Sequence, residues 1–164
     1  MSNYRRLYRP GGTYFFTVNL ARRGASDLVD NIDLLRCAFS RTFAEHPTHC
    51  DAIVILPDHI HAVWTLPAGD ADYSQRWRKI KARFSHWVGE RGRSPSKHRK
   101  RERGLWQRRF WEHTIRGPGD FRACVQYCRN DPVKHGLAAR PEDWVFSSIH
   151  RDIRQGALRL PQTA

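Results

Sequence analysis

Two histidines, His59 and His61, are separated by one apolar residue and directly follow an apolar run over residues 52–56. Side chains of an extended strand alternate between its two faces, so this spacing puts both imidazoles on one face and Ile60 on the other. Two imidazoles about 7 Å apart on a rigid strand can chelate one divalent cation. The chain has nine histidines, so the pair alone is a weak signal, and a His-x-His pair of purely structural origin is the alternative.

A second polar pair, Tyr127 and Asp131, lies four residues apart on a predicted helix at about residues 120–130, which Asp120 caps and Pro132 ends. At about 100° per residue both side chains fall on the flank of its apolar stripe. A tyrosine hydroxyl, with a pKa of about 10, is a poor nucleophile at neutral pH. It can attack a phosphodiester when a divalent ion polarises the phosphate. The alternative for Tyr127 is an aromatic at the core edge with its hydroxyl in water.

The elements that must position these residues follow from hydrophobic periodicity. Strands are predicted at residues 13–20, 50–56, 59–66 and 105–115, and helices at 31–45, 72–90 and 120–130. The first six elements have the order of the split βαβ motif. The sequence therefore predicts an α+β fold with a ferredoxin-like antiparallel sheet, helices on one face, and an extra C-terminal helix carrying Tyr127.

Composition favours a polyanionic partner, because Lys and Arg number 29 against 16 acidic residues, a formal charge of +13. Nucleic acid is the leading candidate and an anionic membrane surface the rival, but no lipidation motif or basic terminal helix supports a membrane. No signal peptide or transmembrane run is visible, so we expect a cytoplasmic protein. The four cysteines lack disulfide spacing, and Cys124 and Cys128 are interpreted as core thiols.

Several basic residues are candidates for phosphate contacts, and ordinary solvated surface is the alternative for each. A basic loop at residues 91–104 is expected to order only on an anion. Arginines next to aromatics in the 105–115 strand could clamp unpaired bases, although Trp106, Phe110 and Trp111 could equally be core. The candidates are Arg5, Arg6, Arg78, Lys79, Lys81, Arg83, Arg108, Arg109 and Lys134.

The segments Pro57–His61 and Tyr127–Gly136 resemble the IS200-like single-tyrosine transposases of the HUH superfamily, and in particular their REP-associated branch. Residues 3–6, 11–20 and 106–113 also resemble that branch, and the similarity runs in order from residue 3 to about 150. The resemblance implies one catalytic domain over residues 1–150, followed by a tail at 151–164. It also implies a bacterial, nucleoid-associated protein that acts as a monomer or a homodimer.

The same resemblance implies cleavage and rejoining of single-stranded DNA beside palindromic repeat hairpins. His59 and His61 would bind Mg²⁺ or Mn²⁺, and Tyr127 would form a 5′-phosphotyrosine link and release a 3′-hydroxyl. The family completes its metal site with Asn or Gln one turn after the tyrosine, where this chain has Asp131. The alternative function is a non-cleaving DNA or RNA hairpin-binding protein derived from such an enzyme. The presence of His59, His61 and Tyr127 together favours the enzyme.

Overall fold

The computed structural model describes residues 6–89 and 104–158 of the 164-residue chain. A four-stranded antiparallel sheet lies at its centre, with the strand order β2-β3-β1-β4 that is typical of a ferredoxin-like fold. Its strands are β1 (Thr13–Asn19), β2 (His49–Ile55), β3 (His59–Thr65) and β4 (Trp111–Thr114). The predicted fold class is confirmed. Arg5 and all of the predicted basic loop except Gly104 lie outside the described residues.

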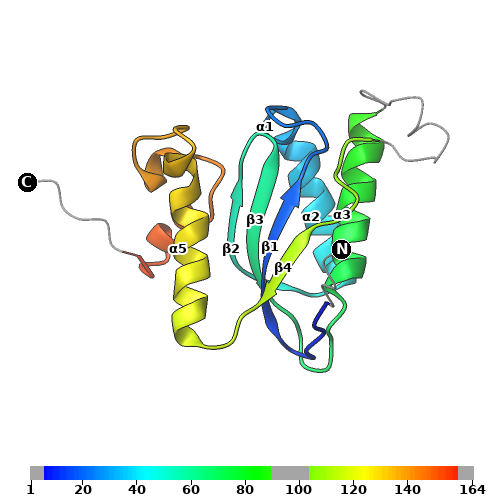
Figure 1. Ribbon diagram of the computed structural model, residues 1–164, viewed down its shortest axis with the longest axis vertical. Helices are drawn as coiled ribbons and strands as arrows, with labels where there is room; N and C mark the ends of the chain where they lie inside the picture. The colour runs from blue at the N-terminus through cyan, green and yellow to red at the C-terminus, as the bar shows by residue number, and fades with distance from the viewer. Residues whose placement is uncertain (1–5, 90–103, 159–164) are drawn as a thin grey trace, which may run out of the picture.

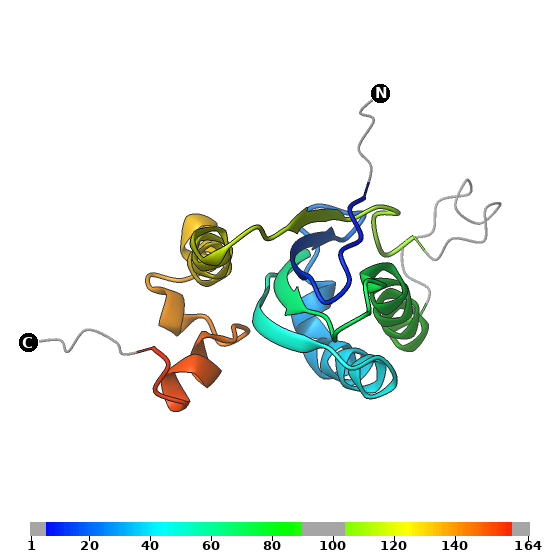
Figure 2. The same cartoon turned by 90° about the horizontal axis from the view of Figure 1, so that it is seen from below.

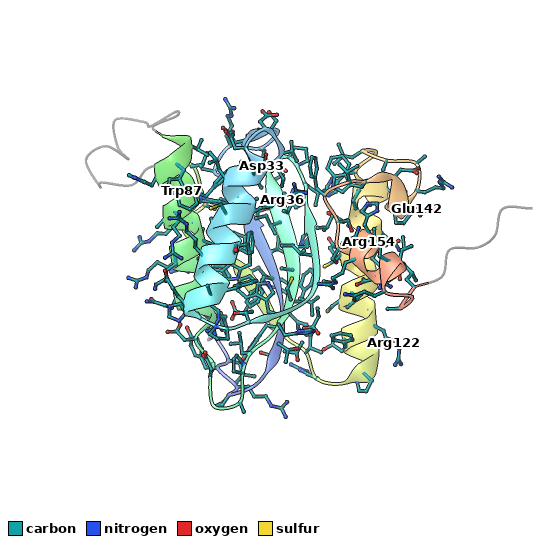
Figure 3. The ribbon with its side chains drawn as sticks, turned by 180° about the vertical axis from the view of Figure 1, so that it is seen from behind. Asp33, Arg36, Trp87, Arg122, Glu142 and Arg154 are labelled. Atoms are coloured by element: carbon teal, nitrogen blue, oxygen red, sulfur yellow. The ribbon has the colours of Figure 1, made fainter. Side chains whose placement is uncertain are left out.

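Helices cover both faces of this sheet (Figures 1 and 2). The long helices α2 (Ile32–Glu45) and α3 (Tyr73–Val88) lie side by side on one face, as Figure 3 shows from behind. The predicted extra helix is α5 (Pro118–Lys134), and it lies on the opposite side of the sheet. The described residues also form three short helices: α1 (Asp27–Asp30), the 3-10 helix η1 (Pro141–Asp143) and α6 (Ile149–Arg154).

The alternation of side chains along β1 and β3 supplies a core on each side of the sheet. On the face towards α2 and α3, Phe16 packs against Trp64, which stacks on Trp77 at 4.3 Å between ring centroids. On the face towards α5, Phe15 and Val63 pack in a smaller cluster with apolar residues of α5. His59 and His61 alternate with Ile60 and Ala62 of the larger cluster, so both imidazoles point towards α5.

The fourth strand is shorter than the predicted range of 105–115. Continuous pairing from Thr17 opposite Trp111 would place Leu20 opposite Arg108, but Leu20 bridges Trp106 instead. Two extra residues must therefore bulge out between the two paired stretches, and Arg108 and Arg109 are exposed there. Two neighbouring arginines cannot both point to solvent in a regular strand, whose side chains alternate between a buried and an exposed face.

One cation of α3, Arg76, is part of the core. Arg76 is 1% exposed, and its guanidinium donates hydrogen bonds to the side chains of Asp70 and Thr48 and to the carbonyls of Pro47 and Asp72. Through these bonds Arg76 joins α3 to the loop that precedes it and to the loop between α2 and β2.

The chain after α5 folds back onto the sheet. It runs along β2, where Ser147 bridges Val54. A register shift in β2 leaves the carbonyls of Cys50 and Asp51 outside the regular ladder, and Arg151 donates hydrogen bonds to both. Helix α6 crosses residue 150, the predicted end of the catalytic domain. Among the described residues, no helix has the length and apolar character needed to span a membrane.

Candidate active site and metal centre

The two strand histidines face one carboxylate from α5. Asp131 Oδ2 lies 3.3 Å from His59 Nε2 and 3.2 Å from His61 Nε2. The carboxyl side chain of Asp131 is fully buried, and the side chains of His59 and His61 are 14% and 5% exposed. The helix and the sheet thus bring together the three residues that the sequence predicted as metal ligands.

Each histidine is oriented by a hydrogen bond on its other ring nitrogen. His59 Nδ1 lies 2.6 Å from Asp58 Oδ1, and His61 Nδ1 lies 2.9 Å from Thr17 Oγ1 of the neighbouring strand. Such partners fix the ring and direct the opposite nitrogen, Nε2, towards a shared point. This is the arrangement that metal-binding histidines have in proteins.

Charge is concentrated around the Asp131 carboxylate. Burial by itself raises the pKa of this carboxyl, but the hydrogen bonds to His59 and His61 outweigh burial and hold the pKa well below its usual range. For His59, burial has the opposite effect and lowers the pKa, but its two carboxylate partners, Asp131 and Asp58, raise the pKa overall. His61 is more deeply buried and its pKa is lowered. Asp131 is therefore an anion, available to a cation at any pH near neutrality.

Tyr127 stands beside this group. Its ring packs edge to face against His61, with centroids 5.1 Å apart and planes at 87°, and against Phe15 at 5.6 Å. The tyrosine is 42% exposed, which is open enough for a polymeric substrate to reach its hydroxyl. Lys134 Nζ lies 5.1 Å from the ring centroid and places positive charge near the phenol. Tyr127 and Asp131 share one flank of α5, as the helical spacing predicted.

The start of α5 differs from the prediction. Helix α5 begins at Pro118, so Asp120 lies inside the first turn and is not the N-cap. Its carboxylate accepts a hydrogen bond from the Arg116 backbone N–H and lies 2.8 Å from His113 Nε2. His113 of β4, for which the sequence suggested no role, thereby fastens the start of the tyrosine helix to the edge of the sheet.

The end of α5 reveals a residue that the sequence reasoning missed. Pro132 does not end the helix, which continues to Lys134 and places His135 one turn after Asp131. His135 Nε2 lies 3.4 Å from Asp131 Oδ2. The four-residue spacing of Asp131 and His135 was visible in the sequence, but it indicates proximity only if the helix passes through Pro132.

The donor set fits a divalent metal ion. The ligand atoms of His59, Asp131 and His135 all lie within 4.8 Å of one another. The second oxygen of Asp131, Oδ1, is buried and has no hydrogen-bond partner among the described residues. A buried oxygen of this kind carries a large desolvation cost unless a cation or a donor meets it. Imidazole nitrogens and a carboxylate suit Mn²⁺ and its neighbours in the first transition series.

Four of the nine predicted phosphate contacts lie away from this centre, on α3, which covers the other face of the sheet. Lys79 and Arg83 both pair with Glu45, and Arg78 bonds to Gln75. Burial lowers the pKa of Lys81 to about 8, and its ammonium donates to the Gln107 carbonyl. These residues form a set of cations along α3.

The other candidates are spread along the chain. The Arg6 guanidinium lies 3.6 Å from the buried carboxylate of Glu112 and stacks over the Phe110 ring. These contacts hold the N-terminal segment against β4 and the residue before it. Arg108 and Arg109 are exposed. Among the candidates that the structure describes, Lys134 is the one that lies beside Tyr127.

Comparisons with known proteins show the family of this chain. No protein-family model matches the chain. A REP-associated tyrosine transposase from Escherichia coli is 44% identical over 156 residues, which cover 95% of this chain and 87% of that protein. A relative from Haemophilus influenzae is also 44% identical over 156 residues, covering 94% of this chain and 89% of that protein.

A solved structure agrees as well. It is the structure of a REP-associated tyrosine transposase bound to a REP hairpin, with a TM-score of 0.85 and 41% sequence identity. The match covers 100% of this chain and 92% of that one. The chain belongs to the REP-associated tyrosine transposase family.

Proposed function

We propose that this protein is a metal-dependent endonuclease and strand transferase that acts on single-stranded DNA at REP-like hairpins. The observation that carries the proposal is the contact of Tyr127 with His61, whose Nε2 faces the buried Asp131. An exposed phenol beside a nitrogen- and oxygen-rich cation site is the combination that a tyrosine nucleophile requires.

His59, His61 and Asp131 would hold the ion, Mg²⁺ or Mn²⁺. When bound, it would polarise a phosphodiester and offset the negative charge that develops on phosphorus oxygens. Thr17 and Asp58 would keep the two imidazoles in the ligating orientation through Nδ1. Lys134 would contribute a further positive charge beside the phenol.

The covalent step would be an exchange of one phosphoester for another. Tyr127 Oη loses its proton to solvent and bonds to phosphorus, while the bond between phosphorus and the 3′ oxygen breaks. The released 3′ oxygen takes up a proton, and the phosphate stays attached to the 5′ carbon of the downstream strand and to Tyr127. Attack by a 3′-hydroxyl on this phosphotyrosine would reverse the sequence and rejoin DNA without an external energy source.

The DNA partner is supported by charge and by the solved relative. The chain carries a formal charge of +13, which suits a polyphosphate. The solved relative is bound to a REP hairpin, and its match covers the full length of this chain. Arg108 and Arg109 project from the bulge before β4, where no described acidic partner neutralises them, and we propose that they contact phosphates.

The function is tested with a labelled single-stranded REP hairpin carrying its flanks, incubated with Mn²⁺ or Mg²⁺ and run on a denaturing gel. We expect a protein–DNA adduct that needs metal and disappears in Tyr127→Phe, but not in the matched surface control Tyr8→Phe. Hairpin binding on a native gel without an adduct in any metal would contradict the enzyme and favour the non-cleaving binder. Competition with a matched RNA hairpin on the native gel shows whether such a binder prefers RNA to DNA.

A further inference from the structure

The end of α5 holds a third imidazole in a fixed place. Gly136 has a φ of +68°, and its N–H donates to the Val133 carbonyl, while the Leu137 N–H donates to the Pro132 carbonyl. This pair of bonds is the Schellman motif, in which a glycine in the left-handed region closes a helix. His135 is the capping residue of this motif, so its backbone position is set by three consecutive hydrogen-bonded residues.

His135 reaches the same carboxylate oxygen as the two strand histidines. Its Nε2 lies 3.4 Å from Asp131 Oδ2, compared with 3.3 Å for His59 and 3.2 Å for His61. Its ring centroid lies 5.1 Å from that of His59. Ligands bonded to one ion at about 2.1 Å lie roughly 3–4 Å apart. The ligand atoms of His59, Asp131 and His135 lie within 4.8 Å of one another, so small side-chain rotations bring these three onto a common ion. His61 lies outside that group of three and meets it through Asp131 Oδ2.

The three imidazoles differ in exposure. The His61 side chain is 5% exposed and lies at the floor of the centre, while His135 is 46% exposed and lies at its solvent side. An ion would enter past His135 and leave the Tyr127 side of the centre free for a phosphate. His135 and Tyr127 lie on opposite sides of Asp131 along α5, so neither blocks the other.

We propose that His135 is an additional metal ligand, which makes the centre rich in nitrogen and selective for Mn²⁺ over Mg²⁺. The inference rests on the proposed metal centre. Mg²⁺ favours oxygen ligands and retains its water, whereas imidazole suits first-row transition ions. A site with three imidazoles and one carboxylate therefore prefers Mn²⁺ over Mg²⁺ more strongly than a site with two imidazoles and one carboxylate. The competing role is an ion pair of His135 with Asp131 at the helix C-terminus, without a bond to metal.

The test counts nitrogen ligands on Mn²⁺ bound to the full-length protein without DNA. Pulsed electron paramagnetic resonance measures ¹⁴N couplings from coordinated imidazoles. We expect three in the wild type and two in His135→Ala. Mn²⁺ affinity should fall by at least about tenfold in His135→Ala, and Mg²⁺ affinity should change by less than about twofold. The matched control is His86→Ala, an exposed histidine of α3 outside the centre.

Equal coupling counts in the wild type and His135→Ala, or equal losses of Mn²⁺ and Mg²⁺ affinity, would overturn the proposal. Thermal unfolding of the metal-free variant, monitored by circular dichroism, checks that its fold is retained. His59→Ala tests the centre itself: unaltered Mn²⁺ binding in that variant would refute the whole metal site. A missing DNA adduct in a protein that binds Mn²⁺ through three imidazoles would instead refute only the proposed cleavage.

Discussion

The Tyr127 ring and the His61 imidazole meet edge to face at 5.1 Å, although they lie 66 positions apart in the sequence and on different elements. The contact exists because His61 points out of the sheet towards α5 and Tyr127 lies on the flank of α5 that faces the sheet. Phe15 lies under both rings, 5.5 Å from His61 and 5.6 Å from Tyr127. This apolar support fixes the distance between the proposed nucleophile and the proposed metal ligands.

Acid should destabilise the metal-free protein through Asp131. Its folded-state pKa lies below the usual 3.8, so its stabilising effect is present above about pH 4 and is lost as the pH falls through the folded value. We expect Asp131→Asn to lower the free energy of unfolding by about 1–3 kcal/mol at pH 6 and to weaken its dependence on pH between 5 and 3. Urea unfolding in EDTA over this range measures both effects, and an unchanged pH dependence in the variant would contradict the account.

Trp111 should bind an unpaired base. It is 50% exposed on the edge strand β4, and its ring packs against Phe15 at 5.8 Å, the same residue that Tyr127 contacts. Stacking of a base on an aromatic ring contributes about 1–3 kcal/mol, so Trp111→Ala should weaken binding of single-stranded DNA by roughly tenfold. Fluorescence anisotropy with a labelled oligonucleotide measures this, and Trp87→Ala, on the opposite helical layer, is the control. Equal affinity of the two variants would exclude the stacking role.

Two arginines of α3 should differ sharply in their effect on stability. Arg76 is buried with four acceptors around it, while Arg78 is exposed. Arg76→Ala should lower the free energy of unfolding by about 2–3 kcal/mol, because four hydrogen bonds are lost and a cavity remains. Arg78→Ala should change it by less than about 0.5 kcal/mol. Similar denaturation midpoints for the two variants would show that the Arg76 network contributes little.

Salt should weaken hairpin binding steeply, because each phosphate contact releases counterions. Replacing both Arg108 and Arg109 by Ala should lessen the slope of log affinity against log salt by about 1–2. The slope is measured by anisotropy with the hairpin between 50 and 200 mM salt. Affinity that does not respond to salt would argue against nucleic acid as the partner.

The fold could be predicted because its signals are local. Alternation placed the histidines on one face of β3, and the apolar stripes of α2 and α3 located the helices that cover the other face. Helical spacing predicted that Tyr127 and Asp131 lie side by side, and the family resemblance supplied their expected roles. The errors arose where a tertiary contact overrides a local rule.

Two examples show the physical reason. Pro132 usually stops a helix, but here the Schellman motif and the burial of Asp131 and Pro132 against the sheet extend α5 past it. For the same reason the sequence alone did not predict that His135 lies close to Asp131. Arginine is usually a surface residue, so the sequence does not predict that Arg76 is buried. Its hydrogen-bond acceptors come from loops that are near it only in the folded protein.

The most direct test of the central claim is to locate the covalent bond to DNA. The protein is incubated with Mn²⁺ and a REP hairpin substrate, and the trapped adduct is digested and analysed by mass spectrometry. We predict one modified peptide, with a nucleotide 5′-phosphate attached to Tyr127. A bond at another residue, or DNA cleavage that proceeds equally well in Tyr127→Phe, would contradict the assignment of Tyr127 as the nucleophile.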